Sequence, residues 1–288
     1  MPLVDIYLPC CGEPLVVLRN TYEHVKKIEY PNFKVHVLDD KNLKEVKELA
    51  KEFGYNYIVR SDRPYMKKAG NLRNAFQITN GEFFLILDAD FCPRYDIFSE
   101  TLPYFCFYEN LAILQTPQFF RVKSNQTWVE KAAGSVQELF YRLIQVNRNR
   151  FHSSICVGTS AIYRRKALIP FGGTYEIEHS EDLHTGFNAT NHGWLVKYLP
   201  LNLSMGMCPD NLTTFFTQQY RWASGSTSLC LNKIFWKSNL TVIQKICYLS
   251  GMFYYSATAL RNRMRLIFPM IIFAANKVST SSLVIFGD

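Results

Sequence analysis

The run Phe83-Phe84-Leu85-Ile86-Leu87-Asp88-Ala89-Asp90 places the strongest constraint on how this chain can fold. Five consecutive apolar residues are typical of a strand that is buried on both faces of a parallel sheet. Asp88 and Asp90 follow directly, and ligands of open α/β sheets bind just beyond the carboxyl ends of strands. Two hard oxygen ligands at such a position suit Mg²⁺ or Mn²⁺ serving a phosphate group. Taken alone, the pattern also fits a strand that ends in an acidic turn.

Apolar strands and amphipathic helices alternate through the first 90 residues. We expect strands at residues 4–9, 34–38, 55–59 and 83–87, and helices at residues 14–27, 42–53 and 68–79. This β-α-β-α-β-α-β order predicts a doubly wound, nucleotide-binding sheet. Polar side chains end three of the strands, and they are Glu13, the pair Asp39 and Asp40, and the pair Asp88 and Asp90. Their recurrence along one sheet edge favours a binding site over three unrelated turns.

The chain beyond Asp90 predicts a mixed α/β continuation of the sheet. We expect helices at residues 97–107, 126–149, 180–190 and 213–226, and strands at residues 112–115, 155–163 and 194–199. Gly158, Thr159 and Ser160 would let a ligand approach the backbone of the strand at 155–163 closely. Residues 1–226 form the expected catalytic domain, and residues 227–288 form a separate helical region.

Charge and cysteine content narrow the class of partner. The net charge of +8 favours anionic partners such as phosphates, nucleic acid or an acidic membrane face. There is no run of five or six basic residues, so we expect no nucleic-acid partner. The eight cysteines contain no C-x-x-C pattern and predict reduced thiols in a cytosolic setting rather than a metal site.

The C-terminal region predicts contact with a membrane surface but contains no apolar stretch of spanning length. A span needs about 18–20 apolar residues, and the nearest stretch, 266–275, is shorter and is interrupted by Pro269. Residues 242–260 are apolar and aromatic, contain Lys245 and precede three arginines. This composition favours a helix lying in a membrane interface. A helix packed against the domain remains the alternative.

Six short motifs together resemble a known family. In chain order they are Asp39-Asp40, Lys68-Ala69-Gly70-Asn71, Asp88-Ala89-Asp90, Thr116-Pro117-Gln118, Ser180-Glu181-Asp182 and Gln218-x-x-Arg221-Trp222. This order resembles that of the processive family 2 glycosyltransferases, the cellulose synthase and cellulose synthase-like enzymes, with hyaluronan and chitin synthases more distant. The resemblance covers residues 4–222 and implies a GT-A-like, Rossmann-type nucleotide-sugar-binding domain.

The resemblance implies a role for each matching residue. Asp39 and Asp40 would hold the uridine, Lys68 the diphosphate and Asp88 the nucleotide sugar. Asp90, with Asp88, would ligate Mg²⁺ or Mn²⁺, and Asp182 would be the catalytic base. The diphosphate and the acceptor would be bound by Gln218, Arg221, Trp222 and Glu181.

Chemistry requires the same residue types for an inverting sugar transfer. One carboxylate must take the proton of the attacking hydroxyl, and a cationic clamp must stabilise the departing diphosphate. Trp222 offers a flat apolar face to a sugar ring. Taken singly, Lys68 could be a surface lysine and Arg221 an ion-pair partner, but their order alongside the other motifs favours a site. If so, Asp90, Asp182 and Arg221 must converge on one cavity.

The chain departs from the family pattern in two loops and in its extent. Ser180-Glu181-Asp182 stands where relatives have Thr-Glu-Asp, and Pro9-Cys10-Cys11-Gly12-Glu13 stands where many have a Tyr-Asn-Glu loop. Channel helices and a gating loop are expected to be missing.

The resemblance as a whole implies a membrane-associated domain that faces the cytoplasm. Its donor would be a UDP-sugar, glucose first, and its acceptor a polysaccharide. Synthases of the chitin, hyaluronan or mannan type and a non-catalytic nucleotide-sugar-binding subunit remain alternatives. A dehydrogenase is disfavoured, because no G-x-G-x-x-G follows the first strand.

Overall fold

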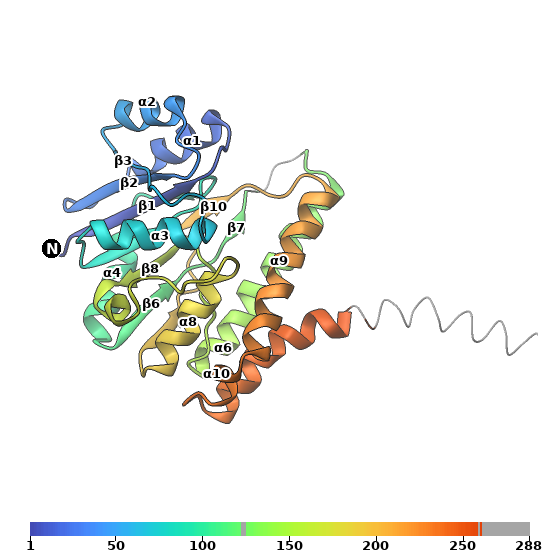
Figure 1. Ribbon diagram of the computed structural model, residues 1–288. Coiled ribbons are helices and arrows are strands. Elements are labelled where there is room, and N and C mark those ends of the chain that lie inside the picture. Colours follow the sequence, from blue (N-terminus) through green and yellow to red (C-terminus); the bar gives the residue numbers. More distant parts are fainter. Residues whose placement is uncertain (122–124, 259, 261–288) are drawn as a thin grey trace, which may run out of the picture.

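A seven-stranded mixed sheet forms the centre of the fold (Figure 1), and the structure, a computed structural model, describes residues 1–121, 125–258 and 260. The strand order is β3-β2-β1-β4-β8-β6-β9. The strands of this sheet are β1 (Val4–Cys10), β2 (Phe33–Asp39), β3 (Asn56–Ile58), β4 (Phe83–Ile86), β6 (Leu111–Gln115), β8 (Ala161–Arg164) and β9 (Leu195–Tyr198). The helices are α1 (Leu15–Val25), α2 (Lys44–Glu52), α3 (Lys67–Ile78), α4 (Ile97–Phe107), α5 (Trp128–Leu139), η1 (Phe140–Gln145), α6 (Val146–Arg150), α7 (Arg165–Leu168), η2 (Ile169–Phe171), α8 (Glu181–Asn191), α9 (Leu212–Leu231) and α10 (Lys233–Trp236).

The strand that precedes Asp88 lies at the middle of the sheet, as its apolar run predicts. β4 pairs in parallel with β1 and antiparallel with β8, and all four of its side chains are buried. The strands β3, β2, β1 and β4 are mutually parallel, which confirms the doubly wound first half. β8 runs antiparallel between β4 and β6, so the whole sheet is mixed.

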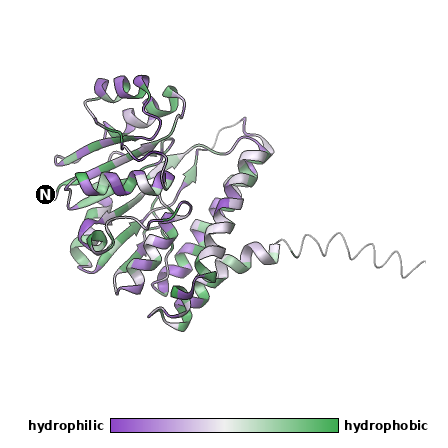
Figure 2. Cartoon of the chain, viewed as in Figure 1, coloured by the Kyte–Doolittle hydropathy of each residue, from purple (hydrophilic) through white to green (hydrophobic). Residues whose placement is uncertain are grey.

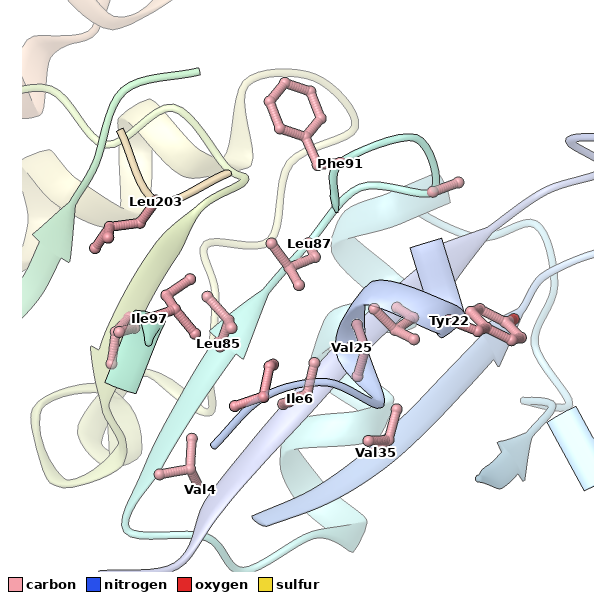
Figure 3. Packing of buried hydrophobic residues seen from close by; sticks show 14 of the residues in the cluster. Val4, Ile6, Tyr22, Val25, Val35, Leu85, Leu87, Phe91, Ile97 and Leu203 are labelled. Atoms are coloured by element: carbon pink, nitrogen blue, oxygen red, sulfur yellow. The ribbon is translucent and has the colours of Figure 1, made fainter. Parts of the chain in front are cut away.

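Two apolar layers cover the faces of this sheet. One contains inward-facing residues of β1 and β4 packed on α1, α2 and α4, and Figure 3 shows Ile6 and Leu85 in the same apolar layer as Val25 of α1. The other packs Tyr7, Phe84 and Ile86 against α3, α7 and α8. Hydrophobic colour follows the central strands in Figure 2, whereas α2 is mostly hydrophilic. Burial on both faces fixes the register of the strands and therefore the position of their carboxyl ends.

The predicted strand at 155–163 is wrong in its first half. Only Ala161–Arg164 forms β8, and residues 155–160 form a loop. Gly158 and Ser160 have φ values of +78° and +54°, which a strand cannot accommodate. The side chain of Gln115 holds this loop, accepting from the Val157 N–H at 2.9 Å and donating to the Thr159 carbonyl at 2.8 Å.

The predicted continuous helix at 126–149 is interrupted by a π-helical segment, η1. It separates α5 from α6, and its last residue, Gln145, is fully buried. The amide of Gln145 donates to the Ile155 carbonyl at 2.7 Å and accepts from the Ile155 N–H at 3.0 Å. π-Helical turns are uncommon and are often found at functional sites.

A second, three-stranded sheet has no counterpart in the sequence prediction. Its order is β5-β10-β7, and its strands are β5 (Cys92–Pro93), β10 (Ser204–Gly206) and β7 (Phe119–Phe120). Strands of two or three residues carry no periodicity, so pattern reasoning cannot find them. This sheet joins the segment after Asp90 to the segment before α9.

The C-terminal helices pack on α8. α9 is continuous through Leu231, so the proposed domain boundary at residue 226 falls within a helix. Leu229 of α9, Phe235 of α10 and Tyr248 form a small core with Leu183 and Phe187 of α8. Residues 242–258 are helical, whereas the stretch 266–275 and the arginines at 261, 263 and 265 lie outside the described residues. Within the part of the chain that the structure describes, no helix is both long and apolar enough to cross a membrane.

A buried polar cluster ties the amino end of the sheet together. Asp5 accepts hydrogen bonds from His36 at 3.0 Å, from the Gly81 N–H at 2.6 Å and from Arg165 at 3.2 Å. Burial by itself raises the pKa of Asp5, but the hydrogen bonds from His36 and Gly81 and the charge of Arg165 more than offset it. The pKa of Asp5 therefore lies below its ordinary value, and the carboxylate stabilises the fold.

We expect Asp5→Asn to lower the free energy of unfolding by about 3 kcal/mol, because it leaves Arg165 without its buried counter-charge. The stabilisation should be complete above the ordinary pKa of Asp, about 3.9, and should be lost as the pH falls further. Urea unfolding at pH 7 measures the difference. The exposed pair of Glu52 and Arg19 supplies the control, Glu52→Gln, which should change little. Equal effects of the two substitutions would contradict a special role for Asp5.

Candidate active site

Lys68 and Asp88 form an ion pair at the carboxyl end of β4. The Lys68 ammonium lies 2.5 Å from Asp88 Oδ1 and 3.0 Å from the Gly158 carbonyl oxygen. Glu181 lies 4.0 Å away. Burial lowers the pKa of Lys68, but the charges of Asp88 and Glu181 outweigh burial and hold it above the ordinary value. Lys68 therefore stays charged and can bind an anionic diphosphate.

Asp90 is a mostly buried carboxylate whose Oδ2 accepts a hydrogen bond from the Met207 N–H at 3.0 Å. Burial, with a smaller contribution from the charge of Asp88, raises the pKa of Asp90. No lysine or arginine of the described ranges pairs with Asp90, so its charge lacks a cationic partner. A divalent cation bound beside Asp90 would neutralise this carboxylate.

Protein ligands alone do not complete a metal centre. Among residues 1–121, 125–258 and 260, no group of three or more His, Cys, Asp or Glu side chains could hold an ion. A cation at Asp88 and Asp90 would therefore take its remaining ligands from phosphate oxygens and water, as Mg²⁺ commonly does.

Asp182 lies in the first turn of α8, beside Glu181. Its Oδ2 packs against Gly158, where a Cβ atom would lie only 2.7 Å from this oxygen. The absence of a side chain at Gly158 makes room for Asp182, and the φ of +78° there independently favours glycine. Burial, and then the charge of Glu181, raises the pKa of Asp182 to about 7, although Lys68 opposes the change. A carboxylate with this pKa can accept a proton near neutral pH.

Gln218, Arg221 and Trp222 lie on α9 at a spacing of three and one residues. This spacing places them on the same side of the helix. α9 lies so close to the segment before α8 that a Cβ atom at Gly225 would overlap the Ser180 hydroxyl. Ser180 occupies the N-cap position of α8, but its side chain makes no capping hydrogen bond.

One cavity of about 990 Å³ brings these segments together. Asp90, Asp182 and Arg221 line it, so the convergence expected from the sequence is present. Of the ten residues to which the family resemblance assigns a role, eight line this cavity: Lys68, Asp88, Asp90, Glu181, Asp182, Gln218, Arg221 and Trp222. Their individual roles stay predictions.

Asp39 and Asp40 are not among the residues that line this cavity, and their carboxylates are engaged elsewhere. Asp39 is fully buried and accepts from the backbone N–H groups of Lys41 and Leu43 and from the Tyr57 hydroxyl. Asp40 accepts two hydrogen bonds of 2.7 Å from Arg60. Both carboxylates therefore anchor loops, and their predicted contact with uridine stays a prediction.

Sequence reasoning missed Arg60, which organises the loop before Lys68. Besides Asp40, the buried guanidinium donates to the Tyr65 carbonyl at 2.5 Å and to the Lys67 carbonyl at 2.9 Å. The sequence feature that could have indicated a role for Arg60 was its position just after β3, where polar residues of the other strand ends also lie. Other cavity-lining residues without a sequence signal include Arg121, Glu130, His179, Met207 and Asp210.

We expect Arg60→Lys to raise the KM for a nucleotide-sugar donor about tenfold, since lysine cannot reproduce these charge-assisted bonds and Lys68 would lose its position. Steady-state kinetics would show the change in KM with kcat much less affected. Arg164 provides the matched control, because it also donates to backbone carbonyls but at the other side of the fold. Arg164→Lys should leave the KM unchanged; an equal rise would mean that only general stability had been lost.

Comparison with known proteins identifies the family to which the chain belongs. Residues 5–171 match the family described as Glycosyl transferase family 2. The chain belongs to this family. Cellulose synthase catalytic subunits (UDP-forming) of Pseudomonas fluorescens and Komagataeibacter xylinus are 32% and 33% identical to it over 88% and 87% of the chain. The expected likeness to the cellulose synthase type is thereby confirmed.

This family 2 glycosyltransferase chain spans 35% and 34% of the length of those two relatives. Its fold resembles that of the mannosyltransferase PcManGT from Pyrobaculum calidifontis, solved with GDP-Man and Mn²⁺, with a TM-score of 0.73, 14% identity and coverage of 99% of this chain and 81% of that one. Residues 1–349 of TarS from S. aureus, solved with UDP-GlcNAc, give a TM-score of 0.65, 14% identity and coverage of 89% and 74%. The expected GT-A fold class is confirmed.

Proposed function

We propose that this chain is the catalytic domain of an inverting β-glycosyltransferase that moves a hexose from a UDP-sugar to the end of a growing polysaccharide. The convergence of Asp90, Asp182 and Arg221 on one cavity, from three separate parts of the chain, carries this proposal. Relatives named as UDP-forming cellulose synthase subunits support UDP-glucose as the first donor to test.

Each side of the reaction has its own residues in the proposed mechanism. Asp182 removes the proton from the acceptor hydroxyl as the acceptor oxygen bonds to the anomeric carbon of the donor. The bond between that carbon and the diphosphate oxygen breaks, and UDP departs with the electron pair. Lys68 and Arg221 stabilise the charge that develops on the diphosphate. Trp222 orients the acceptor sugar against its apolar face.

Asp88 and Asp90 would hold the divalent cation, Mg²⁺ or Mn²⁺. When bound, the cation would neutralise charge on the leaving diphosphate. The mostly buried carboxylate of Asp90, which has no lysine or arginine partner among the described residues and whose pKa is raised by burial, supports this assignment.

A panel of radiolabelled donors tests the function and its alternatives. The purified chain, with Mn²⁺ or Mg²⁺, is offered UDP-glucose, UDP-GlcNAc, UDP-glucuronate and GDP-mannose, and both UDP or GDP release and product length are measured. We expect release with UDP-glucose above all. Preference for another donor would favour a chitin, hyaluronan or mannan type of synthase. Metal-dependent UDP binding without release from any donor would indicate a non-catalytic binding subunit.

We further propose that the C-terminal helices lie on the cytoplasmic face of a membrane. Exposed apolar side chains gather there with lysines between them, namely Ile234, Trp236, Val242, Ile243, Ile246, Lys233 and Lys237. Such a surface suits the interface of an anionic bilayer. Sedimentation with vesicles containing anionic lipid should retain the chain at low salt, and Trp236→Glu should release it. Equal binding of the variant would contradict the proposal.

A further inference from the structure

A second cavity, of about 360 Å³, adjoins the first. It lies between η1, α9 and the helix at 242–258, and it shares Asp182 and Trp222 with the larger cavity. Most of its wall is apolar, formed by Val136, Leu139, Phe140, Ile144, Ile155, Tyr254 and Tyr255. Its volume lies within the range of about 300–1,000 Å³ that is usual for small-molecule sites.

Two residues with ionisable, charge-bearing side chains line this cavity, Asp182 and Arg148 of α6, and Arg148 lies among its apolar residues. Arg148 is 5% exposed, and one of its terminal nitrogens, Nη2, donates to the Ser250 hydroxyl at 2.8 Å. Its Nε and Nη1 are buried and have no hydrogen-bond partner among the described residues. No carboxylate in those residues forms an ion pair with it. Among the described residues, two donor nitrogens of the guanidinium and its positive charge therefore have no counterpart.

A buried charge without a partner is costly, and a chain gains nothing for its stability by keeping one. The cost is recovered when an anion binds. A guanidinium is especially suited to phosphate or carboxylate, because its planar fork can donate two parallel hydrogen bonds. Burial also lowers the pKa of Arg148, although an arginine stays protonated over the physiological range.

We propose that this second cavity binds an amphiphilic molecule with an apolar body and one anionic group, a phosphate or a carboxylate, which Arg148 holds. Bound in this way, the molecule would also reach Asp182 and Trp222, which line the same space. It would then be an acceptor or a primer that presents a hydroxyl to the base. That last step rests on the proposed function, whereas the binding itself does not.

Isothermal titration of the full chain, without donor, tests the site. The probes are decyl phosphate, decanoate, the neutral decyl maltoside and inorganic phosphate. We expect decyl phosphate or decanoate to bind at least about tenfold more tightly than decyl maltoside, and inorganic phosphate to bind weakly, because it cannot use the apolar wall. Equal affinity for decyl maltoside and the anionic probes would overturn the proposal.

Variants at Arg148 provide the second readout. Arg148→Met should remove the preference for the anionic probes, and Arg148→Lys should retain part of it. Arg148→Met should also melt at the same temperature as the unliganded parent or higher, because it removes an unpaired buried charge. The matched control is Arg142→Met, since Arg142 is an exposed residue of η1 paired with Glu138. A lower melting temperature of Arg148→Met together with an unchanged preference for anions would assign Arg148 a structural role.

The outcome is separable from that of the proposed function. If no donor supports transfer but anionic amphiphiles bind through Arg148, the proposed function fails and the site stands. If transfer proceeds and the probes bind without preference, the site fails alone.

Discussion

Asp182→Asn should lower kcat for sugar transfer by about 10³-fold or more, within the range that removal of a general base produces. The amide has nearly the shape of the carboxylate but cannot take the proton of the acceptor hydroxyl. The KM for the donor should change little, because Lys68 and Asp88 keep their contact. Rates of UDP release at saturating donor measure the loss, and polymer synthesis at the parental rate would refute the assignment of the base.

The pH dependence follows from the pKa of about 7 at Asp182. Only the ionised form can act as a base, so kcat/KM should fall about tenfold per pH unit below pH 7 and level off above it.

The folding stability should change with pH in the opposite direction. Because burial raises the pKa of Asp182 in the folded protein, folding stability falls as the pH rises from about 4 to about 7. Asp182→Asn should therefore gain stability relative to the parent at pH 8, by up to about 4 kcal/mol, and gain little at pH 4.5.

A neighbouring acidic residue gives the control for Asp182. Glu178 also lines the cavity, but it is exposed and pairs with Lys67 at 2.6 Å. Glu178→Gln should keep most of the activity and an unchanged pH profile. Loss of activity in this variant equal to that of Asp182→Asn would show that any change of charge in the cavity is harmful.

Removal of the proposed metal, or of Asp90 as its proposed ligand, should have the second largest effect. EDTA should reduce transfer by about 10³-fold, and Mn²⁺ or Mg²⁺ should restore it, since the diphosphate leaves poorly without a cation. Asp90→Asn should show a similar loss that added metal does not repair. Titration of Mn²⁺ in the presence of UDP, followed by electron paramagnetic resonance, should show weaker binding in the variant.

Asp210 supplies the comparison for Asp90. It lines the same cavity, but its carboxylate is engaged by the side chain of Asn211 at 2.7 Å. Asp210→Asn should leave both Mn²⁺ affinity and activity close to those of the parent. Full activity of the parent chain in EDTA would exclude a required cation and would leave Lys68 and Arg221 as the clamp on the diphosphate.

Three of these groups show the conflict between stability and function. Asp90, Asp182 and Arg148 each carry a charge that is buried without full compensation within the described residues. A ligand of opposite charge, or a proton in transfer, would complete each of them. The predicted gain in stability when Asp182 or Arg148 is neutralised is therefore a signature of function, because structural charges such as Asp5 should give the opposite sign.

The regular elements could be predicted from the sequence because their information is local. The apolar run before Asp88 and the alternation of the first ninety residues predict buried parallel strands, and the order of the motifs predicts the family. Errors arose where contacts that are distant in sequence decide the backbone. The loop at 155–160 is held by hydrogen bonds from the side chain of Gln115. The π-helical turn η1 ends at Gln145, whose side chain is hydrogen-bonded to the backbone of Ile155. The second sheet joins strands too short to leave a pattern.

The sequence by itself determined that Asp88 and Asp90 follow a doubly buried strand, since hydrophobic burial acts on residue type and periodicity alone. Only the tertiary structure decided what surrounds them. Lys68 comes from α3, Met207 from the segment after β10, and Asp182 from α8 across Gly158. The pKa of about 7 at Asp182, and the two nitrogens of Arg148 that have no hydrogen-bond partner among the described residues, depend on burial by elements far apart in the chain. Electrostatic character of this kind arises from packing, so it exists only once the chain is folded.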